Sequence, residues 1–382
     1  MFMSRNLIVL FFSDVYFQEM SAREPRRSRP AGLDAVVTTQ DLAGLGSIYS
    51  MAVDADGTRF ACTTSALHAF SPHRVKLLIT GHKTETGFAD GEDTNARFNL
   101  PCGIAVHGEG NVLVADTYNH ALRKVTLRCG TVSTLAANRE EGFADGISAA
   151  ARFNLPWGIM VDAQGAIVVA DSNNICLRQV FPGDGAVSTL AGDAEEHSGF
   201  ADGQGKTARF NYPVGLALDT DSHIIVANKR NNCIRKVTTA EGRVTTVAGS
   251  AEAVEDIADT AAAAARFFHL LAVAVDCNNN ILVADQGNNC IQMIAGTVNW
   301  VTTVAGSAEE KGKVGGTGAS VRFMEPDGLA LDEGGRLLLL DGNEGCVRVV
   351  EASLAPPQRL APKMQPIKIS LMQKMLVNNR KS

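Results

Sequence analysis

The sequence predicts an all-β fold: a six-bladed β-propeller of four-stranded antiparallel blades, closed by an N-terminal strand that completes the last blade. Three observations predict it: a short motif that returns five times, four strand-like segments in each repeat, and a spare strand-like segment before the first repeat. The motif is Ala-Arg-Phe-Asn or a close variant, and its successive phenylalanines are 55, 57, 57 and 56 residues apart. The phenylalanines are Phe98, Phe153, Phe210, Phe267 and Phe323, and the arginines before them are Arg97, Arg152, Arg209, Arg266 and Arg322. Self-similarity at such a period indicates a repeat architecture.

The repeat over residues 100–136 illustrates the strand pattern. Its segments 103–106, 111–116, 121–125 and 131–136 are short, rich in Val, Ile and Thr, and separated by Gly, Asn and Asp. Such runs and separators are strand and turn signals. The same cycle recurs in the later repeats, and four antiparallel strands repeated radially describe a propeller.

The two ends of the repeat region predict how the ring closes. Residues 51–81 form a degenerate first unit, and the last unit shows only three good strands, ending near Val350. The segment 35–44 is similar to the fourth strands of other units, so we expect it to be the outer strand of the last blade. Closure would remove an exposed sheet edge. We therefore expect a disordered extension over 1–34, the propeller over 35–351, and a Pro/Lys-containing tail over 352–382 that is disordered or a short helix.

Two sets of acidic or amide residues recur in step with the motif. One set follows each phenylalanine by 18 residues: Asp116, Asp171, Asn228, Asp285 and Asp341. The other ends the first strand of each unit: Asp54, Asp162, Asp219, Asp276 and Asp332. Asp and Asn side chains hold turns closed by accepting nearby backbone N–H groups, and a site needs asymmetry, so both sets are interpreted as structural.

Each clear repeat also carries an insertion, best seen as Gly-Phe-Ala-Asp-Gly at 87–91, 142–146 and 199–203. Asp90 precedes Arg97 by seven residues, and the other copies keep this spacing. The spacing predicts an Asp–Arg contact or an Asp that caps a short turn within each loop. We expect the phenylalanines to wedge between blades, and the loops to share one face with the turns after Asp116 and its equivalents.

That loop face is where we expect a partner to bind, because function concentrates in surface loops held by a rigid frame. Residues just before each inner strand should surround the mouth of the channel, and they are mostly apolar. With two neighbours from the adjoining turns, the candidate contact set is Cys102, Tyr118, Trp157, Val214, His269, Leu271 and Asp327. This set suits a peptide or protein better than chemistry, so we expect a non-catalytic binding scaffold.

The composition bears on other functions. A net charge of −6 gives no electrostatic footprint for nucleic acid, and 4 Tyr and 2 Trp offer few stacking aromatics, which disfavours an RNA-binding module. The eight histidines are scattered, and no Gly-x-Ser-x-Gly, His-Glu-x-x-His or phosphate loop is present. We assign no catalytic residue, metal ligand or cofactor and expect a monomer. The alternative is a metal-dependent lyase or hydrolase with its site at the channel mouth.

Cysteine usage indicates the compartment. Cys176, Cys233, Cys290 and Cys346 occupy one repeat position, too far apart for disulfides between units, so they are expected to be free buried thiols. Free thiols in that number favour a reducing compartment, here the cytoplasm. The apolar run 7–12 leaves secretion as an alternative, although it is shorter than a usual signal-sequence core, and no stretch is long enough for a membrane span.

Several segments resemble the NHL-repeat family. Asn119-His120-Ala121-Leu122-Arg123-Lys124-Val125 resembles the stretch that names it, and Pro156-Trp157-Gly158-Ile159 resembles its entry segment. The resemblance implies a six-bladed propeller; the family includes ubiquitin-ligase subunits, RNA-binding modules, scaffolds and a few lyase-type enzymes. Asn228 and Leu270-Leu271-Ala272 depart from its pattern, and no Cys-x₂-Cys array of a RING domain is present. A role as the substrate-recognition part of a ubiquitin-ligase-like assembly would therefore require a partner chain or a further domain outside this sequence.

Overall fold

The computed structural model describes residues 35–41, 45–70, 76–108, 110–194, 198–251, 259–296, 299–308, 310–342 and 346–351. The expected N-terminal extension (1–34) and C-terminal tail (352–382) lie outside the described residues. In the described part of the chain, no helix is long and apolar enough to cross a membrane.

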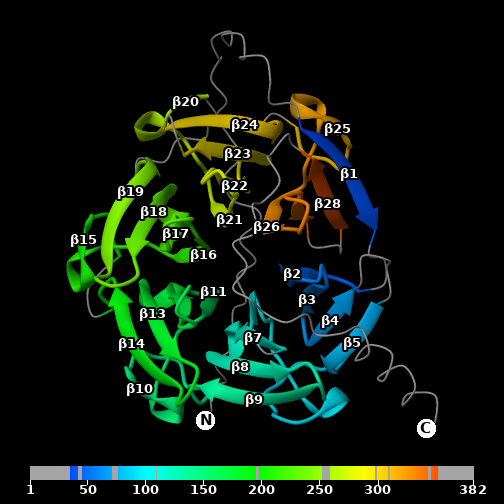
Figure 1. Cartoon of the computed structure of the whole chain (residues 1–382), viewed down its shortest axis with the longest axis vertical. Helices are drawn as coiled ribbons and strands as arrows, with labels where there is room; N and C mark the ends of the chain where they lie inside the picture. Colours follow the sequence, from blue (N-terminus) through cyan, green and yellow to red (C-terminus); the bar gives the residue numbers. More distant parts are fainter. Residues whose placement is uncertain are drawn as a thin grey trace, which may run out of the picture. The chain divides into compact units, whose positions relative to one another are not determined.

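Six antiparallel sheets form the blades of the predicted propeller (Figure 1). Blade one contains β2 (Ile48–Val53), β3 (Arg59–Thr63), β4 (Ala66–Phe70) and β5 (Lys76–Gly81). Blade two contains β6 (Gly103–His107), β7 (Asn111–Asp116), β8 (Ala121–Thr126) and β9 (Thr131–Ala136). Blade three contains β11 (Pro156–Val161), β12 (Ile167–Asp171), β13 (Cys176–Phe181), β14 (Ala186–Ala191) and the short β10 (Gly146–Ile147).

The remaining blades repeat this order. Blade four contains β16 (Pro213–Leu218), β17 (His223–Asn228), β18 (Cys233–Thr238), β19 (Arg243–Gly249) and β15 (Gly203–Gln204). Blade five contains β21 (Leu270–Val275), β22 (Ile281–Asp285), β23 (Cys290–Ala295), β24 (Trp300–Gly306) and β20 (Thr260–Ala261). Blade six contains β26 (Pro326–Leu331), β27 (Leu337–Asp341), β28 (Cys346–Glu351), β1 (Val36–Asp41) and β25 (Gly316–Thr317).

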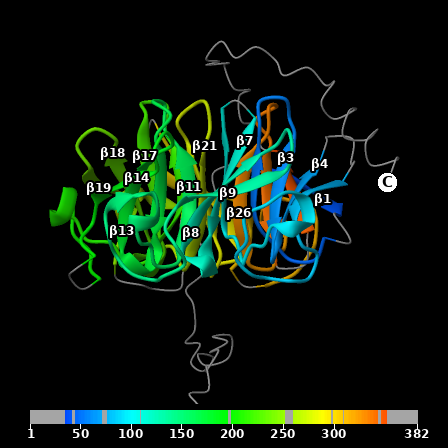
Figure 2. The same ribbon diagram turned by 90° about the horizontal axis from the view of Figure 1, so that it is seen from below.

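The first strand of each blade is the innermost, and these strands contact one another around the ring. The contacts run from β2 through β6, β11, β16, β21 and β26, and β26 contacts β2 again. Seen from below, the sheets of neighbouring blades stand side by side (Figure 2). The predicted closed ring of six blades is confirmed.

Burial along the strands explains why they form where they do. Every residue of β12 and β22 is buried, because a middle strand is covered by a neighbouring blade on each face. The outer strand β14 is only partly buried, with Ser188 exposed between buried Val187 and Ala191. The motif phenylalanines Phe98 and Phe153 are 0% exposed and lie in clusters that join adjacent blades, as the wedge interpretation requires.

Ring closure follows the sequence prediction. β1 pairs with β28 in antiparallel register, from Val36 opposite Glu351 to Asp41 opposite Cys346. Its start also pairs with β25, and Val37 is 2% exposed. The first strand of the chain thus supplies the outer strand of the last blade.

The insertions add a two-residue strand to the outer edge of blades three to six, followed by a single 3₁₀ turn. These turns are η3 (Ser148–Ala150), η5 (Gly205–Thr207), η7 (Ala262–Ala264) and η8 (Gly318–Ser320), with η1 (Asp93–Asn95) in blade two. Ser148 connects two blades: its carbonyl accepts the N–H of Ala137 at 3.0 Å, and its own N–H donates to the carbonyl of Gly185 at 2.9 Å. Its positive φ of 49° recurs at Gly205, with φ of 54°. The insertions therefore fasten each blade to the preceding one.

The turn acids and the cysteines behave largely as expected. Oδ1 of Asp162 accepts the N–H groups of Gln164 and Ala166, at 2.9 and 2.8 Å, and its equivalents in blades one, four, five and six make the same pair of bonds. All eight cysteines are free. Cys176, Cys233 and Cys290 are buried, whereas Cys346, also expected to be buried, is partly exposed.

Candidate functional site

The loop face is organised by a buried arginine in each of four blades. In blade three, Arg178 is fully buried and bonds two carboxylates: Nη1 lies 2.8 Å from Oδ2 of Asp171, and Nη2 lies 2.6 Å from Oδ1 of Asp145. The same guanidinium donates to the carbonyl oxygens of Ala144 and Arg152. The Arg178 side chain thus connects Asp171, at the end of the middle strand, to the Gly-Phe-Ala-Asp-Gly motif and to the Ala-Arg-Phe-Asn motif.

Aromatic rings complete this arrangement. The guanidinium carbon of Arg178 lies 4.7 Å from the ring centroid of Phe143 and 5.2 Å from that of Phe153. A cation over aromatic faces is stabilised electrostatically. The Phe and Asp of Gly-Phe-Ala-Asp-Gly and the Phe of Ala-Arg-Phe-Asn therefore converge on one buried cation, as they also do on Arg123 and Arg235. The equivalent Arg348 contacts Phe323 and Asp341, because the insertion before blade six lacks Gly-Phe-Ala-Asp-Gly.

This geometry corrects the predicted contact within each insertion. Asp90 binds Arg123, with Nη2 at 2.6 Å, and also accepts the N–H of Thr134; it does not bind Arg97. Arg97 pairs instead with Glu85. The loop is still closed on itself, but by the backbone pair of Ala89 and Arg97.

Blades four and five depart from the pattern in opposite ways. In blade four Asn228 replaces the middle-strand acid, so Arg235 keeps only the carboxylate of Asp202. In blade five Gln292 replaces the arginine, and its Nε2 donates to Asp285 at 2.9 Å. Burial raises the pKa of Asp285 to about 7, compared with about 6 for Asp116 and Asp171, whose arginines lower it.

Replacing Asp285 by asparagine should therefore change the pH dependence of stability. A buried acid whose folded pKa is raised from 3.8 to about 7 makes the free energy of unfolding fall as pH rises between these values. Asp285→Asn removes this loss, while its amide oxygen can still accept the N–H of Phe268, as Asn228 accepts that of Asn211. The urea unfolding midpoints of both proteins at pH ~5 and ~8 measure this effect. The stability of the variant relative to wild type should be greater at pH ~8 than at pH ~5. An equal difference at both pH values would contradict the assignment.

Of the candidate contact residues expected at the channel mouth, some are exposed or partly exposed and others are buried. The rings of Trp157 and Tyr212 meet edge to face, with centroids 6.3 Å apart. Tyr118 is 51% exposed, and His269 is exposed with its ring stacked on Phe268. Cys102, Val214 and Leu271 are buried below the surface.

Polar residues that the sequence interpretation missed lie beside this set. Gln286 donates to Oδ1 of Asp327 at 2.6 Å, and Lys229 is within electrostatic range of the same acid. Burial raises the pKa of Asp327 to about 7 and lowers the pKa of Lys229. The detectable signal was a break in the repeat: Lys229-Arg230 stands where the other turns begin Thr117-Tyr118, Ser172-Asn173 and Gln286-Gly287.

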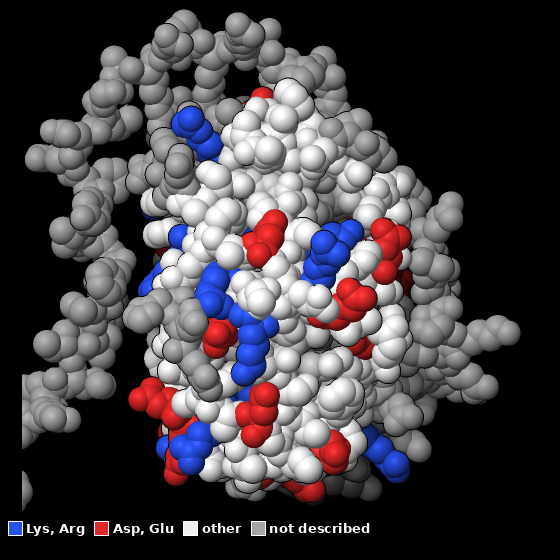
Figure 3. Space-filling model, turned by 90° about the vertical axis from the view of Figure 1, so that its left-hand side faces the viewer, with Lys and Arg blue, Asp and Glu red and all other residues white. Residues whose placement is uncertain are grey.

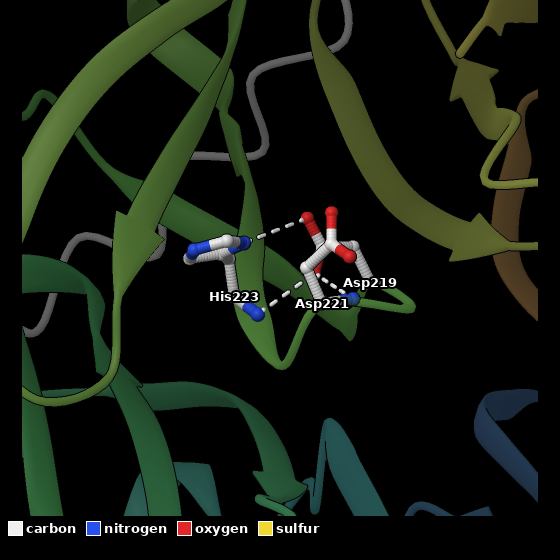
Figure 4. Close-up of side chains that lie close together, drawn as sticks. All are labelled: Asp219, Asp221 and His223. Atoms are coloured by element: carbon white, nitrogen blue, oxygen red, sulfur yellow. Dashed lines mark hydrogen bonds and ion pairs between the residues drawn. The ribbon is translucent and has the colours of Figure 1, made fainter. Parts of the chain in front are cut away.

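One group of acid and imidazole side chains in the described residues brings its potential metal-ligand atoms together: Asp219, Asp221 and His223 (Figure 4). It lies in the turn between β16 and β17, not in the turns of the loop face. Oδ1 of Asp219 accepts two backbone N–H groups, and its Oδ2 lies 2.7 Å from Nζ of Lys236. The carboxylate is therefore already engaged, and burial and the Lys236 bond act on it in opposite directions, leaving its pKa lowered.

The outer surface of the ring shows mixed charge. On the side that Figure 3 presents, blue and red side chains alternate and no continuous basic stripe runs across it. A nucleic-acid footprint requires clustered basic residues. The described residues on the side that Figure 3 presents therefore form no such basic cluster.

The comparisons with known proteins agree with the geometry. Residues 98–125, 153–180 and 210–237 match the NHL repeat, each running from the motif phenylalanine into the third strand of blades two, three and four. Protein SUPPRESSOR OF QUENCHING 1, chloroplastic, of Arabidopsis thaliana is 29% identical over 299 residues, which cover 72% of this chain and 27% of that protein. NHL repeat-containing protein 2 of Gallus gallus is 26% identical over 345 residues, covering 78% of this chain and 45% of that protein. The chain thus spans less than half the length of these relatives.

Among solved structures, virginiamycin B lyase from Staphylococcus aureus is similar in fold. It has a TM-score of 0.54 at 12% identity, over 83% of this chain and 99% of that chain. At this identity the likeness shows the fold alone, because one fold supports many functions.

Proposed function

Because the chain is an NHL-repeat β-propeller protein, we propose that it is a non-catalytic scaffold that binds a peptide or protein segment on its loop face. The observation that supports this most is the aromatic pair of Trp157 and Tyr212 at the channel mouth, with exposed Tyr118 on the same face. Rigid aromatic side chains that are partly exposed commonly anchor interfaces. The frame that holds them is fixed by the buried arginines and the interblade bonds.

The resemblance to the family suggests a more specific role. The chain would recognise substrates for a ubiquitin-ligase-like assembly whose catalytic RING domain lies outside this sequence, and it would act as a monomer in the cytoplasm. Co-purification of a RING-containing protein with the tagged chain would support this role. Recovery of partners without any ligase component would contradict it.

The alternative is a metal-dependent lyase or hydrolase at the channel mouth, for which the buried carboxyl group of Asp327 is the motivation. Its candidate acid would be Asp327, because burial raises the pKa of this carboxyl group to about 7. Metal analysis of the purified protein separates the two functions. One tightly held metal ion per chain, lost in Asp327→Asn, would favour the enzyme.

Replacing Trp157 by alanine should weaken partner binding while the fold persists. Truncation of an aromatic anchor typically costs about 2 kcal/mol or more, roughly a thirtyfold rise in Kd. The measurement is affinity capture followed by titration of the recovered partner against both proteins. The chain supplies its own control, Trp300→Ala: Trp300 begins β24 and is 42% exposed. Equal effects of the two changes, or an effect of Trp300→Ala alone, would show that the loop face is not the binding surface.

A further inference from the structure

We propose that this scaffold recognises a carboxylate of its peptide partner, held by Arg230 in a pocket on the loop face between blades three and four. The inference rests on the proposed function and specifies what the bound peptide must carry. The pocket lies where the turn η4 (Ser172–Asn174) of blade three faces the entry to blade four and the turn η6 (Lys229–Asn231).

The pocket is small and polar. Its volume is about 270 Å³, and its polar lining comes from Ser172, Asn173, Ser198, Asn211, Tyr212 and Arg230. Pockets for drug-sized ligands occupy about 300–1,000 Å³. This one therefore suits a single side chain or the end of a peptide, delivered by a chain that lies across the face.

The charge of the pocket selects an anion. Among the described residues that line the pocket, Arg230 is the one that carries a charge, and none is a carboxylate. Among the described residues no ion pair of Arg230 occurs. Its guanidinium carbon lies 4.8 Å from the ring centroid of Tyr212, and this stacking holds the side chain in place. The hydroxyl of Ser172 already donates to the carbonyl of Pro213, and Nδ2 of Asn173 donates to Oδ1 of Asn154 at 3.3 Å, which leaves that amide a second N–H. The hydroxyl of Ser198 and the side-chain amide of Asn211 also line the pocket.

A carboxylate fits this donor set better than a phosphate group. Recognition of phosphorylated or strongly acidic motifs uses clusters of arginines, whereas a planar carboxylate can be bound by one guanidinium. Lys229, the neighbour of Arg230, adds a second positive charge nearby, although it is within electrostatic range of Asp327 and Glu325. The basic pair occurs in one turn of the ring only among the described turns, which gives the repeated face the asymmetry that a binding site needs.

The aromatic pair places the pocket next to the channel mouth. Tyr212 lines the pocket on one side and contacts Trp157 on the other. A peptide anchored on Trp157 would therefore have an acidic side chain, or its own C-terminal carboxylate, within reach of Arg230. Both sources present the same chemistry.

The test selects peptides that bind the full chain from a library of displayed random peptides. The enriched peptides are then synthesised, and their binding is titrated by fluorescence anisotropy. We expect enriched peptides to carry Asp or Glu at a fixed position or to require a free C-terminus. Arg230→Gln should raise their Kd by about tenfold or more, the scale of a charge-assisted hydrogen bond. Replacing the peptide's acid by its amide, or amidating its C-terminus, identifies which carboxylate is bound and should reproduce the loss.

The matched control is Arg243→Gln, since Arg243 is an exposed arginine of the same blade at the start of β19, away from the pocket. Its effect should stay within about twofold. If peptides bind but Arg230→Gln matches wild type, or if Arg243→Gln costs as much, the carboxylate pocket is wrong and the scaffold function stands. If no peptide is enriched, the proposed function and this inference fall together.

Discussion

Replacing Arg178 by glutamine is expected to destabilise the propeller by about 3–5 kcal/mol, because it leaves the buried carboxylate of Asp171 without its counter-charge. Both partners of this pair are 0% exposed. Glutamine is the natural test residue, since Gln292 occupies the equivalent position in blade five. The measurement is the midpoint and slope of urea unfolding at neutral pH.

Two further variants make the result specific to the buried charge. Arg152→Gln removes a partly exposed arginine that pairs with Glu140, and such surface pairs contribute about 0–1 kcal/mol. The double change Asp171→Asn with Arg178→Gln removes both buried charges and should recover much of the loss. A single Arg178→Gln change that costs no more than Arg152→Gln would show that the buried ion pair does not hold the blade.

Removing residues 1–44 is expected to abolish cooperative folding of the ring, since it deletes β1 and exposes the edge of β28. An unpaired edge is a template for aggregation, so the truncated protein should be recovered mainly as aggregate. Size-exclusion chromatography and thermal melting measure the outcome. Deletion of 1–30, which keeps β1, should leave the melting temperature close to that of the full chain.

A point substitution tests the same closure without shortening the chain. Val37 is 2% exposed and packs with Phe323 and Val350, so Val37→Asp would bury an unpaired charge at a cost of about 4 kcal/mol or more. The neighbouring Thr38 is exposed, and Thr38→Asp should change stability by about 0.5 kcal/mol or less. Equal tolerance of both changes would contradict the packing of β1 into blade six.

The blades and their tight turns could be predicted because their signals are local. Strand and turn residues alternate within each repeat, and Asp162 bonds N–H groups only two and four residues away. Closure by β1 was also predictable, because its Val-Val-Thr-Thr pattern is similar to that of the outer strands, although its partner is distant in the sequence.

The buried arginines were missed because their partners are distant in sequence. Asp90 and Arg123 are 33 residues apart, whereas Arg97 lies seven residues from the same acid, so spacing alone favoured the wrong partner. The available signal was an arginine 25 residues after the motif phenylalanine in four of the five clear repeats, each directly preceded by an apolar residue in the third strand. An arginine in such a strand requires buried anions.

The channel mouth was only partly predictable for a different reason. Position at the start of an inner strand singled out Trp157, which the structure places as the second residue of β11, in contact with Tyr212. Tyr212 has a left-handed backbone, with φ of 57°. A non-glycine residue in that region is uncommon and is not readable from residue type. The stacking of Arg230 on Tyr212, and hence the pocket, could not be derived from the sequence.

The pairing of β1 with β28 also sets the order in which the molecule can fold. Val36 and Glu351 lie opposite each other in the sheet, yet almost the whole propeller separates them along the chain. Contacts of such long range fold slowly, since chain closure must be completed before they form. During synthesis β1 leaves the ribosome before blades one to five and stays without its partner until β28 follows. Of the described strands, the first to be synthesised is thus the last to be paired, and its open edge is prone to aggregation until the ring closes.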